Sequence, residues 1–245
     1  MAGHSKFANI KHKKEKQDSK RAKLFTKFGK EISVAVKLGG SDISTNSRLK
    51  DVITKARANN MPNDNIDRAI KKAAGDKGSA NFEAATYEGF GPSGVAVIVE
   101  TLTDNKTRTV SNVRASFNKG EGNLGVSGSV AFQFDHIGQI TVLAADDICE
   151  EDLMMLTIDA GATDFTAEDE GYVITTEPLG LGAVLEAMEA ANIPVLTAEV
   201  IMQPHMYTKL TNPLDIKNMN KILNALEDDD DVQAVFHNWE DGDGN

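Results

Sequence analysis

Basic side chains are concentrated at the start of the chain, where they could neutralise the phosphates of a nucleic acid. Residues 1–30 contain 10 Lys or Arg but only two acidic residues, Glu15 and Asp18, which gives a net charge of +8. Lysine binds phosphate mainly through its charge and through counterion release, without reading base sequence. We therefore expect this segment to contact a polyanion. The alternative is that its lysines only keep a solvated tail in solution.

Flat side chains accompany these lysines. Phe7, His4 and His12 could stack on unpaired bases, which favours RNA or single strands, and the scarcity of arginine argues against sequence-specific readout. The candidate nucleic-acid-binding residues are His4, Lys6, Phe7, Lys11, His12, Lys13, Lys14, Lys16, Lys20, Arg21, Lys23, Lys27, Lys30 and Lys37. Weaker candidates are Arg48, Lys55, Lys106 and Arg108. For the last two, a polar turn that caps a helix is the alternative and slightly favoured interpretation.

The rest of the chain has the opposite charge. Residues 1–77 contain 19 basic and 8 acidic residues, a net charge of +11, whereas residues 78–245 contain 7 basic and 29 acidic residues, a net charge of −22. This division is typical of a protein in which one part binds a polyanion and another part stays away from it. The acidic part is then the surface that could meet the ribosome or a protein partner.

Other chemistry is poorly supported by the sequence. One cysteine, Cys149, excludes an internal disulfide and a multi-cysteine zinc site. The Gly-x-Gly-x-x-Gly matches at 89–94 and 120–125 lack the strand-to-helix context of a dinucleotide site, and the run Asp228–Asp231 is interpreted as a solvated loop. We therefore expect no enzyme activity, cofactor or metal. The absence of a membrane-spanning run and of an apolar signal core favours a cytoplasmic location.

Helical periodicity positions the basic residues. Apolar residues recur at spacings of three and four over 19–38, 47–59 and 63–75, which predicts three helices, the second capped by Asn46. In the first helix the lysines lie opposite the apolar face. Residues 1–77 are thus predicted to form a basic arm and helical domain, followed by a linker rich in small residues.

The acidic part alternates between strand and helix patterns. Strands at 137–143, 162–167, 171–176 and 195–202, with helices at 146–159 and 181–191, give the order β-α-β-β-α-β of a ferredoxin-like sandwich over residues 136–203. Strands at 95–100, 129–134, 206–210 and 232–237 and helices at 107–119 and 214–226 flank it. We expect an α+β multidomain protein in which residues 81–135 and 204–239 form a second ferredoxin-like sandwich that holds the first as an insertion. One continuous mixed sheet is the alternative.

Several separated motifs resemble the YebC family. They are the opening stretch from Met1 to Phe28, Lys37-Leu-Gly-Gly, Asn59-Asn-Met-Pro, Tyr87-Glu-Gly-Phe-Gly-Pro, Thr103-Asp-Asn-Lys-Thr-Arg-Thr and Gly122-Asn-Leu-Gly. Phe7 stands where the family pattern usually has Trp, and Ser47 where it often has Pro. The resemblance implies a basic helical domain followed by two α/β domains.

The resemblance also implies a function. Family members are described as probable DNA-binding transcriptional regulators, and the mitochondrial members as translational activators of cytochrome oxidase synthesis. The family is also associated with relief of ribosomes stalled on proline-rich sequence. We therefore expect a non-enzymatic nucleic-acid-binding regulator of gene expression. The alternatives are a ribosome-associated translation factor that binds RNA, a protein-interaction scaffold, and a metal-dependent nuclease that uses Asp228–Asp231.

Overall fold

The computed structural model describes residues 21–75, 81–145 and 148–240. Contacts divide these residues into two compact units. One contains 21–75, 81–131 and 208–240, and the other contains 132–145 and 148–207. None of the helices in these ranges is both long and apolar enough to span a bilayer.

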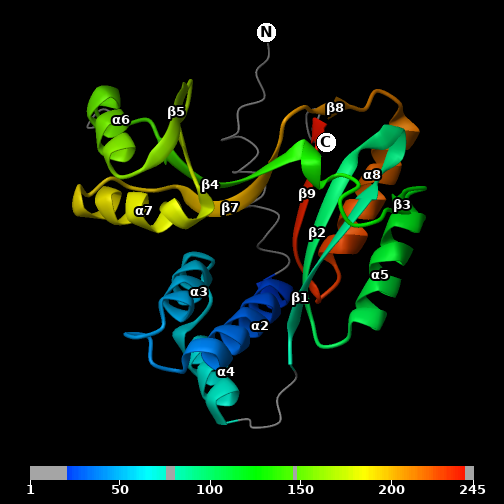
Figure 1. Cartoon of the computed structure of the whole chain (residues 1–245), viewed down its shortest axis with the longest axis horizontal. Coiled ribbons are helices and arrows are strands. Elements are labelled where there is room, and N and C mark those ends of the chain that lie inside the picture. The colour runs from blue at the N-terminus through cyan, green and yellow to red at the C-terminus, as the bar shows by residue number, and fades with distance from the viewer. Residues whose placement is uncertain (1–20, 76–80, 146–147, 241–245) are drawn as a thin grey trace. The chain divides into compact units, whose positions relative to one another are not determined.

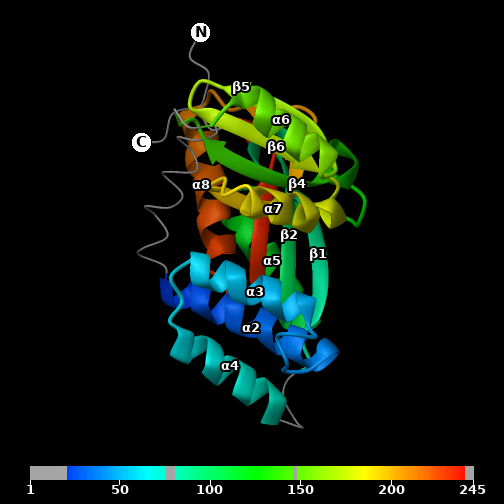
Figure 2. The ribbon, with the colours of Figure 1, turned by 90° about the vertical axis from the view of Figure 1, so that its left-hand side faces the viewer.

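The first three described helices form a small layer around a common core (Figure 2). They are α2 (Arg21–Gly39), α3 (Ser47–Ala58) and α4 (Asn63–Gly75). Ile32, Leu49 and Ile53 lie fully or almost fully inside this core, as the spacing of apolar residues predicts. These residues, 21–75, are called the helical region below. The finer division of the chain at residue 77 stays a prediction.

Asn46 connects α2 to α3. Its side-chain oxygen accepts a hydrogen bond from the backbone N–H of Leu49 at 3.0 Å, so the predicted cap of α3 is confirmed. Its amide nitrogen donates to the carbonyls of Ala35 and Gly40, at 2.8 and 2.7 Å. A Cβ at Gly39 would lie 2.7 Å from this buried side chain. Glycine therefore ends α2 because no larger residue fits against Asn46.

The same unit contains a four-stranded antiparallel sheet in the order β3-β1-β2-β9 (Figure 1). The strands are β1 (Glu83–Phe90), β2 (Ala96–Thr103), β3 (Asn123–Leu124) and β9 (Val232–His237). Two helices, α5 (Lys106–Lys119) and α8 (Pro213–Glu227), cover one face and enclose Phe117, Ile222 and Leu226. The short strands β8 (Thr208–Lys209) and β10 (Trp239–Glu240) pair in parallel beside them.

The other unit has the predicted order β-α-β-β-α-β. Its elements are β4 (Phe134–Leu143), α6 (Glu150–Asp159), β5 (Ala162–Glu168), β6 (Gly171–Thr176), α7 (Leu181–Ala190) and β7 (Thr197–Pro204). The strands form an antiparallel sheet in the order β5-β6-β4-β7, with Ile140, Ile174 and Val184 in its core. The expected α+β class is thus confirmed.

The structure differs from the predicted elements at a few positions. The strand predicted at 129–134 is wrong, because Ala131–Gln133 form a 3-10 turn and β4 begins only at Phe134. The helix predicted from residue 146 begins at Glu150. Strand β1 has no counterpart among the predicted elements, since its small and polar residues lack a clear apolar alternation.

Glu88 explains the turn that replaces the predicted strand. Its carboxylate, which is almost fully buried on β1, accepts backbone hydrogen bonds from Gly128, Val130 and Ala131 at 2.7–2.8 Å. Burial opposes ionisation of Glu88, but the three N–H donors outweigh it and lower the pKa of this carboxyl group. Backbone donors that would otherwise pair in a strand are thus bound by one side chain.

We predict that Glu88→Gln lowers the free energy of unfolding by about 1–3 kcal/mol. The amide carries no charge, and its NH2 group would face backbone N–H groups of the turn, which are donors themselves. Glu83→Gln on the same strand is the matched control, since the Glu83 side chain is 62% exposed. Urea denaturation of both variants measures the difference. Equal stability of the two variants would show that the Glu88 contacts do not hold the turn.

Candidate nucleic-acid interface

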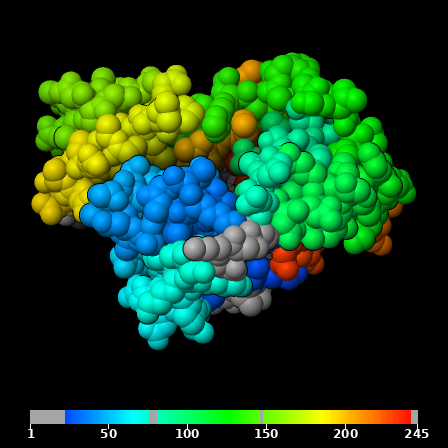
Figure 3. Space-filling model, turned by 60° about the horizontal axis from the view of Figure 1, so that its bottom comes forward, coloured from blue at the N-terminus to red at the C-terminus, as the bar shows by residue number. Residues whose placement is uncertain are grey.

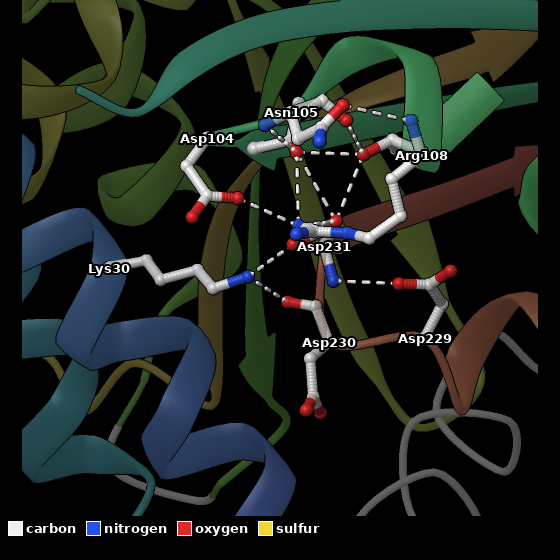
Figure 4. Close-up of polar contacts among 9 residues, drawn as sticks. Lys30, Asp104, Asn105, Arg108, Asp229, Asp230 and Asp231 are labelled. Atoms are coloured by element: carbon white, nitrogen blue, oxygen red, sulfur yellow. Dashed lines mark hydrogen bonds and ion pairs between the residues drawn. The ribbon is translucent and has the colours of Figure 1, made fainter. Parts of the chain in front are cut away.

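Two of the predicted nucleic-acid-binding lysines bind carboxylates of the chain itself. The acceptors lie in the turn between α8 and β9, called here the acidic turn (Asp228–Asp231). The Lys23 ammonium lies 2.9 Å from the carboxylate of Asp228, and that of Lys30 lies 2.6 Å from the carboxylate of Asp231 (Figure 4 shows the second pair). The acidic turn therefore fixes one side of α2 against the sheet of the same unit.

Asp231 is the centre of these contacts. Asp231 is only 4% exposed, so the prediction that Asp228–Asp231 form a solvated loop is wrong at Asp231. One carboxylate oxygen receives Lys30, and the other receives Arg108 at 2.6 Å and Thr109 at 2.9 Å. Its backbone N–H donates to the carboxylate of Asp229. A single carboxylate thus connects α2, the start of α5 and the start of β9.

The environment of Asp231 strongly favours its charged form. Burial alone would raise the pKa, but hydrogen bonds from Lys30, Arg108 and Thr109 outweigh burial and lower the pKa to about 2. Asp231 is therefore ionised throughout the physiological pH range, and its negative charge offsets the two cations. The Lys30 side chain is only 14% exposed, so the predicted row of lysines does not continue into solvent at this position.

The pair of Lys23 and Asp228 differs from the buried pair. Its side chains are 43% and 56% exposed, and an open pocket of about 540 Å³ lies beside the acidic turn. Ion pairs at this exposure contribute about 0–1 kcal/mol and are screened by salt. Lys23 can therefore exchange Asp228 for another anion at little cost in free energy. Lys30 cannot leave Asp231 in the same way, because the buried carboxylate would lose its counter-charge.

The weaker candidates on α5 have structural partners. Asn105 caps α5 by accepting a hydrogen bond from the backbone N–H of Arg108, and the Arg108 guanidinium binds both Asp231 and Asp104. Lys106 lies 2.5 Å from Glu83. These contacts agree with the favoured interpretation of a polar turn that caps a helix. The pKa values of Lys106 and Arg108 are raised, chiefly by the hydrogen bonds that they donate to their carboxylate partners.

Exposed basic side chains remain on α3 and α4 of the helical region, whose surface is blue and cyan in Figure 3. Arg48 and Lys55 on α3 lie near Glu31, whose pKa is raised by burial and lowered in part by these two cations. The other exposed basic residues of the helical region are Lys37 on α2, Lys50 and Arg57 on α3, and Arg68, Lys71 and Lys72 on α4. Residues 21–75 carry 12 basic and five acidic residues, so this region has a net charge of +7.

Sequence reasoning did not select most of this second group. Lys50 and Arg57 on α3 and Lys71 and Lys72 on α4 are all exposed. The candidate binding residues from His4 to Lys20 lie outside the described residues. Arg21 belongs to α2, Lys27 is partly buried, and Lys37 donates to the side-chain oxygen of Asn81 at 3.3 Å. Within the described ranges no cluster of His, Cys, Asp or Glu is arranged to hold a metal ion.

We predict that Asp231→Asn lowers the free energy of unfolding by about 2–4 kcal/mol, because it leaves Lys30 without its buried counter-charge. Asp230→Asn is the matched control, since Figure 4 shows its carboxylate pointing away from Lys30 and Arg108. Because the pKa of Asp231 is lowered, its charge stabilises the fold above about pH 4, and this contribution of roughly 2 kcal/mol is lost as the pH falls toward 2.

Urea denaturation between pH 7 and pH 2 measures both effects. The difference in stability between the wild-type protein and Asp231→Asn is expected to shrink over that acid range, while Asp230→Asn follows the wild type. A constant difference down to pH 2 would contradict the assignment of the lowered pKa to this carboxylate.

Comparisons with known proteins cover nearly the whole chain. Residues 5–76 match the TACO1/YebC protein N-terminal domain, and residues 82–239 match the TACO1/YebC second and third domain. A protein of Lachnoclostridium phytofermentans is 54% identical over 98% of this chain and all of its own length, and one of Agathobacter rectalis is 56% identical with the same coverage. Both are named "Probable transcriptional regulatory protein".

A solved structure has the same fold. The crystal structure of the conserved hypothetical protein Aq1575 from Aquifex aeolicus is 41% identical and covers 93% of each chain, with a TM-score of 0.78. The two domain matches follow each other in the order in which the helical region and the two sheets occur here. The chain therefore belongs to the TACO1/YebC family.

Proposed function

We propose that this protein is a non-enzymatic regulator of gene expression that binds nucleic acid through its basic first part. The observation that carries the proposal is the separation of charge, +11 in residues 1–77 against −22 in residues 78–245. The names of the relatives, which are probable transcriptional regulatory proteins, support the same class. The acidic part is too negative to approach phosphates, so it leaves the basic part as the binding surface.

Within this surface, the exposed residues of α3 and α4 join the arm as phosphate contacts. Eight of the 12 basic residues in the helical region are lysines, which act on phosphate as point charges. Binding of this kind follows the backbone and reads little base sequence. Binding of this kind fits duplex DNA or structured RNA. Structured RNA is the target expected for a ribosome-associated translation factor.

A competition titration distinguishes the two targets. Labelled protein is offered duplex DNA and intact ribosomes together at near-physiological salt. Preference for ribosomes supports a translation factor, and preference for duplex DNA supports transcriptional regulation. Binding of neither target would contradict the proposal and favour a scaffold in which basic and acidic parts pair with each other.

We predict that the combined change Arg48→Gln, Lys50→Gln and Lys55→Gln weakens binding and flattens the salt dependence of affinity. Each lost phosphate contact lowers the slope of log K against log salt by about 0.9 on duplex DNA. These side chains are exposed on α3, so the fold is expected to survive. Lys217→Gln on α8, which removes one exposed charge elsewhere in the unit, is the control. Unchanged slopes would exclude α3 from the interface.

Lys23 belongs to the proposed surface, but it is paired with a carboxylate that a phosphate group would have to displace. Its carboxylate partner, Asp228, acts there as an internal substitute for phosphate, and the pair is weak because both side chains are exposed. Lys30 is instead proposed to position α2, because its partner Asp231 is buried.

We predict that Asp228→Asn raises the affinity for nucleic acid severalfold at low salt, because Lys23 no longer has to leave a carboxylate. Asp215→Asn, which removes one charge at the other end of α8, is the control for net charge. Fluorescence anisotropy with a labelled duplex measures both variants. Equal gains in the two variants would show that only the net charge matters.

A further inference from the structure

The unit that contains β4 to β7 has an extreme charge. Its segment, residues 132–207, contains 15 Asp or Glu and no Lys or Arg, and we call it the acidic unit. Natural domains normally mix both signs, and about a quarter of their residues are charged. A net charge of −15 repels phosphates over the screening length of about 8 Å. Nucleic acid is therefore an unsuitable occupant for the surface of this unit.

Helix α6 exposes apolar side chains in this acidic surface. Met154, Met155 and Ile158 are 41%, 62% and 45% exposed, whereas Leu153 of the same helix is buried in the core. Residues three and four positions apart are neighbours on a helix, so Ile158 lies beside both methionines. We call these three residues the methionine patch. Figure 1 shows α6 next to β5, and the patch is the part of α6 that the core does not use.

Carboxylates border the methionine patch. Glu150, Glu151 and Asp152 form the first turn of α6, and the spacing of three and four residues places them beside Met154 and Met155. An acidic first turn is favourable for any helix, because it complements the helix dipole. That explanation accounts for the charges but not for the exposed apolar side chains next to them.

We propose that the methionine patch and the first turn of α6 bind a basic amphipathic segment of another protein. Its apolar side chains would cover the methionines, whose flexible thioethers adapt to different partners, and its lysines or arginines would pair with the carboxylates. A second acidic unit is unsuitable, because a patch-to-patch dimer would bring two charges of −15 together. This surface belongs to a different unit from the helical region, and it gives the acidic unit a role in recruiting protein.

The chain supplies its own reporter for a test. Cys149 is its sole cysteine, is exposed, and lies directly before α6, so a fluorophore attached there senses binding at the patch. The probe is a synthetic peptide with leucines along one helical face and lysines along the other, and it carries a quencher. A peptide of the same composition in scrambled order lacks the apolar face but keeps the charge. Calorimetry with unlabelled full-length protein gives the affinities without the dye.

The amphipathic peptide is expected to bind about tenfold more tightly than the scrambled one and to quench the dye. Met155→Gln is expected to weaken it by about tenfold, since it removes the most exposed apolar side chain of the patch. Leu179→Gln is the matched control, because Leu179 is 99% exposed in the same unit but lies outside α6, and its affinity should match the wild type.

Several outcomes would overturn the proposal. Equal affinity for the two peptides, or an unchanged affinity of Met155→Gln, would show attraction by charge alone. Self-quenching that rises with protein concentration and disappears in Met155→Gln would identify a second copy of this chain as the occupant. Loss of nucleic-acid binding in Met155→Gln would assign the patch to nucleic acid instead. Failure of the nucleic-acid experiments above would leave this result unaffected, because the peptides contain no phosphate.

Discussion

The carboxylate of Asp231 is the interaction on which the arrangement of the larger unit depends. It binds Lys30 of α2 with one oxygen and Arg108 of α5 with the other, and it does so while almost fully buried. The pair of Lys30 and Asp231 has little exposure, at 14% and 6%, whereas the Arg108 side chain is 46% exposed. Removal of Lys30 or Asp231 therefore leaves its partner as a buried charge without its counter-ion, which makes this pair firmer than an exposed one. The helical region is thus joined to the sheet by these ion pairs.

These ion pairs give the basic residues of α2 different roles. Lys23 and Lys30 look equivalent along the helix in sequence. Lys30, however, is paired with a buried carboxylate, whereas Lys23 is held only by an exposed ion pair. The same acidic turn that stabilises α2 therefore also competes for its cations. In a protein proposed to bind phosphate, such a turn sets a threshold that a polyanion has to exceed, and it disfavours weak and incidental anions.

The opposite charges also separate two kinds of surface. The helical region has an excess of cations on α3 and α4, while the sequence of the acidic unit contains no Lys or Arg. Charges of this size direct different partners to different parts of one chain, because each surface repels what the other attracts. A regulator proposed to connect nucleic acid with protein would need such a division.

Periodicity, capping and composition act locally along the chain, so they are enough to predict the α+β class, most helices and strands, the Asn46 cap and the division of charge. They could not decide that Glu88 binds the backbone of residues 128–131, that Asp231 is buried while Asp230 is exposed, or that Lys30 is paired. These contacts join residues 40 to 201 positions apart, and four consecutive aspartates look alike until the fold places one of them inside. Such contacts follow from the folded arrangement of the chain, because burial and pairing depend on neighbours that are distant in sequence.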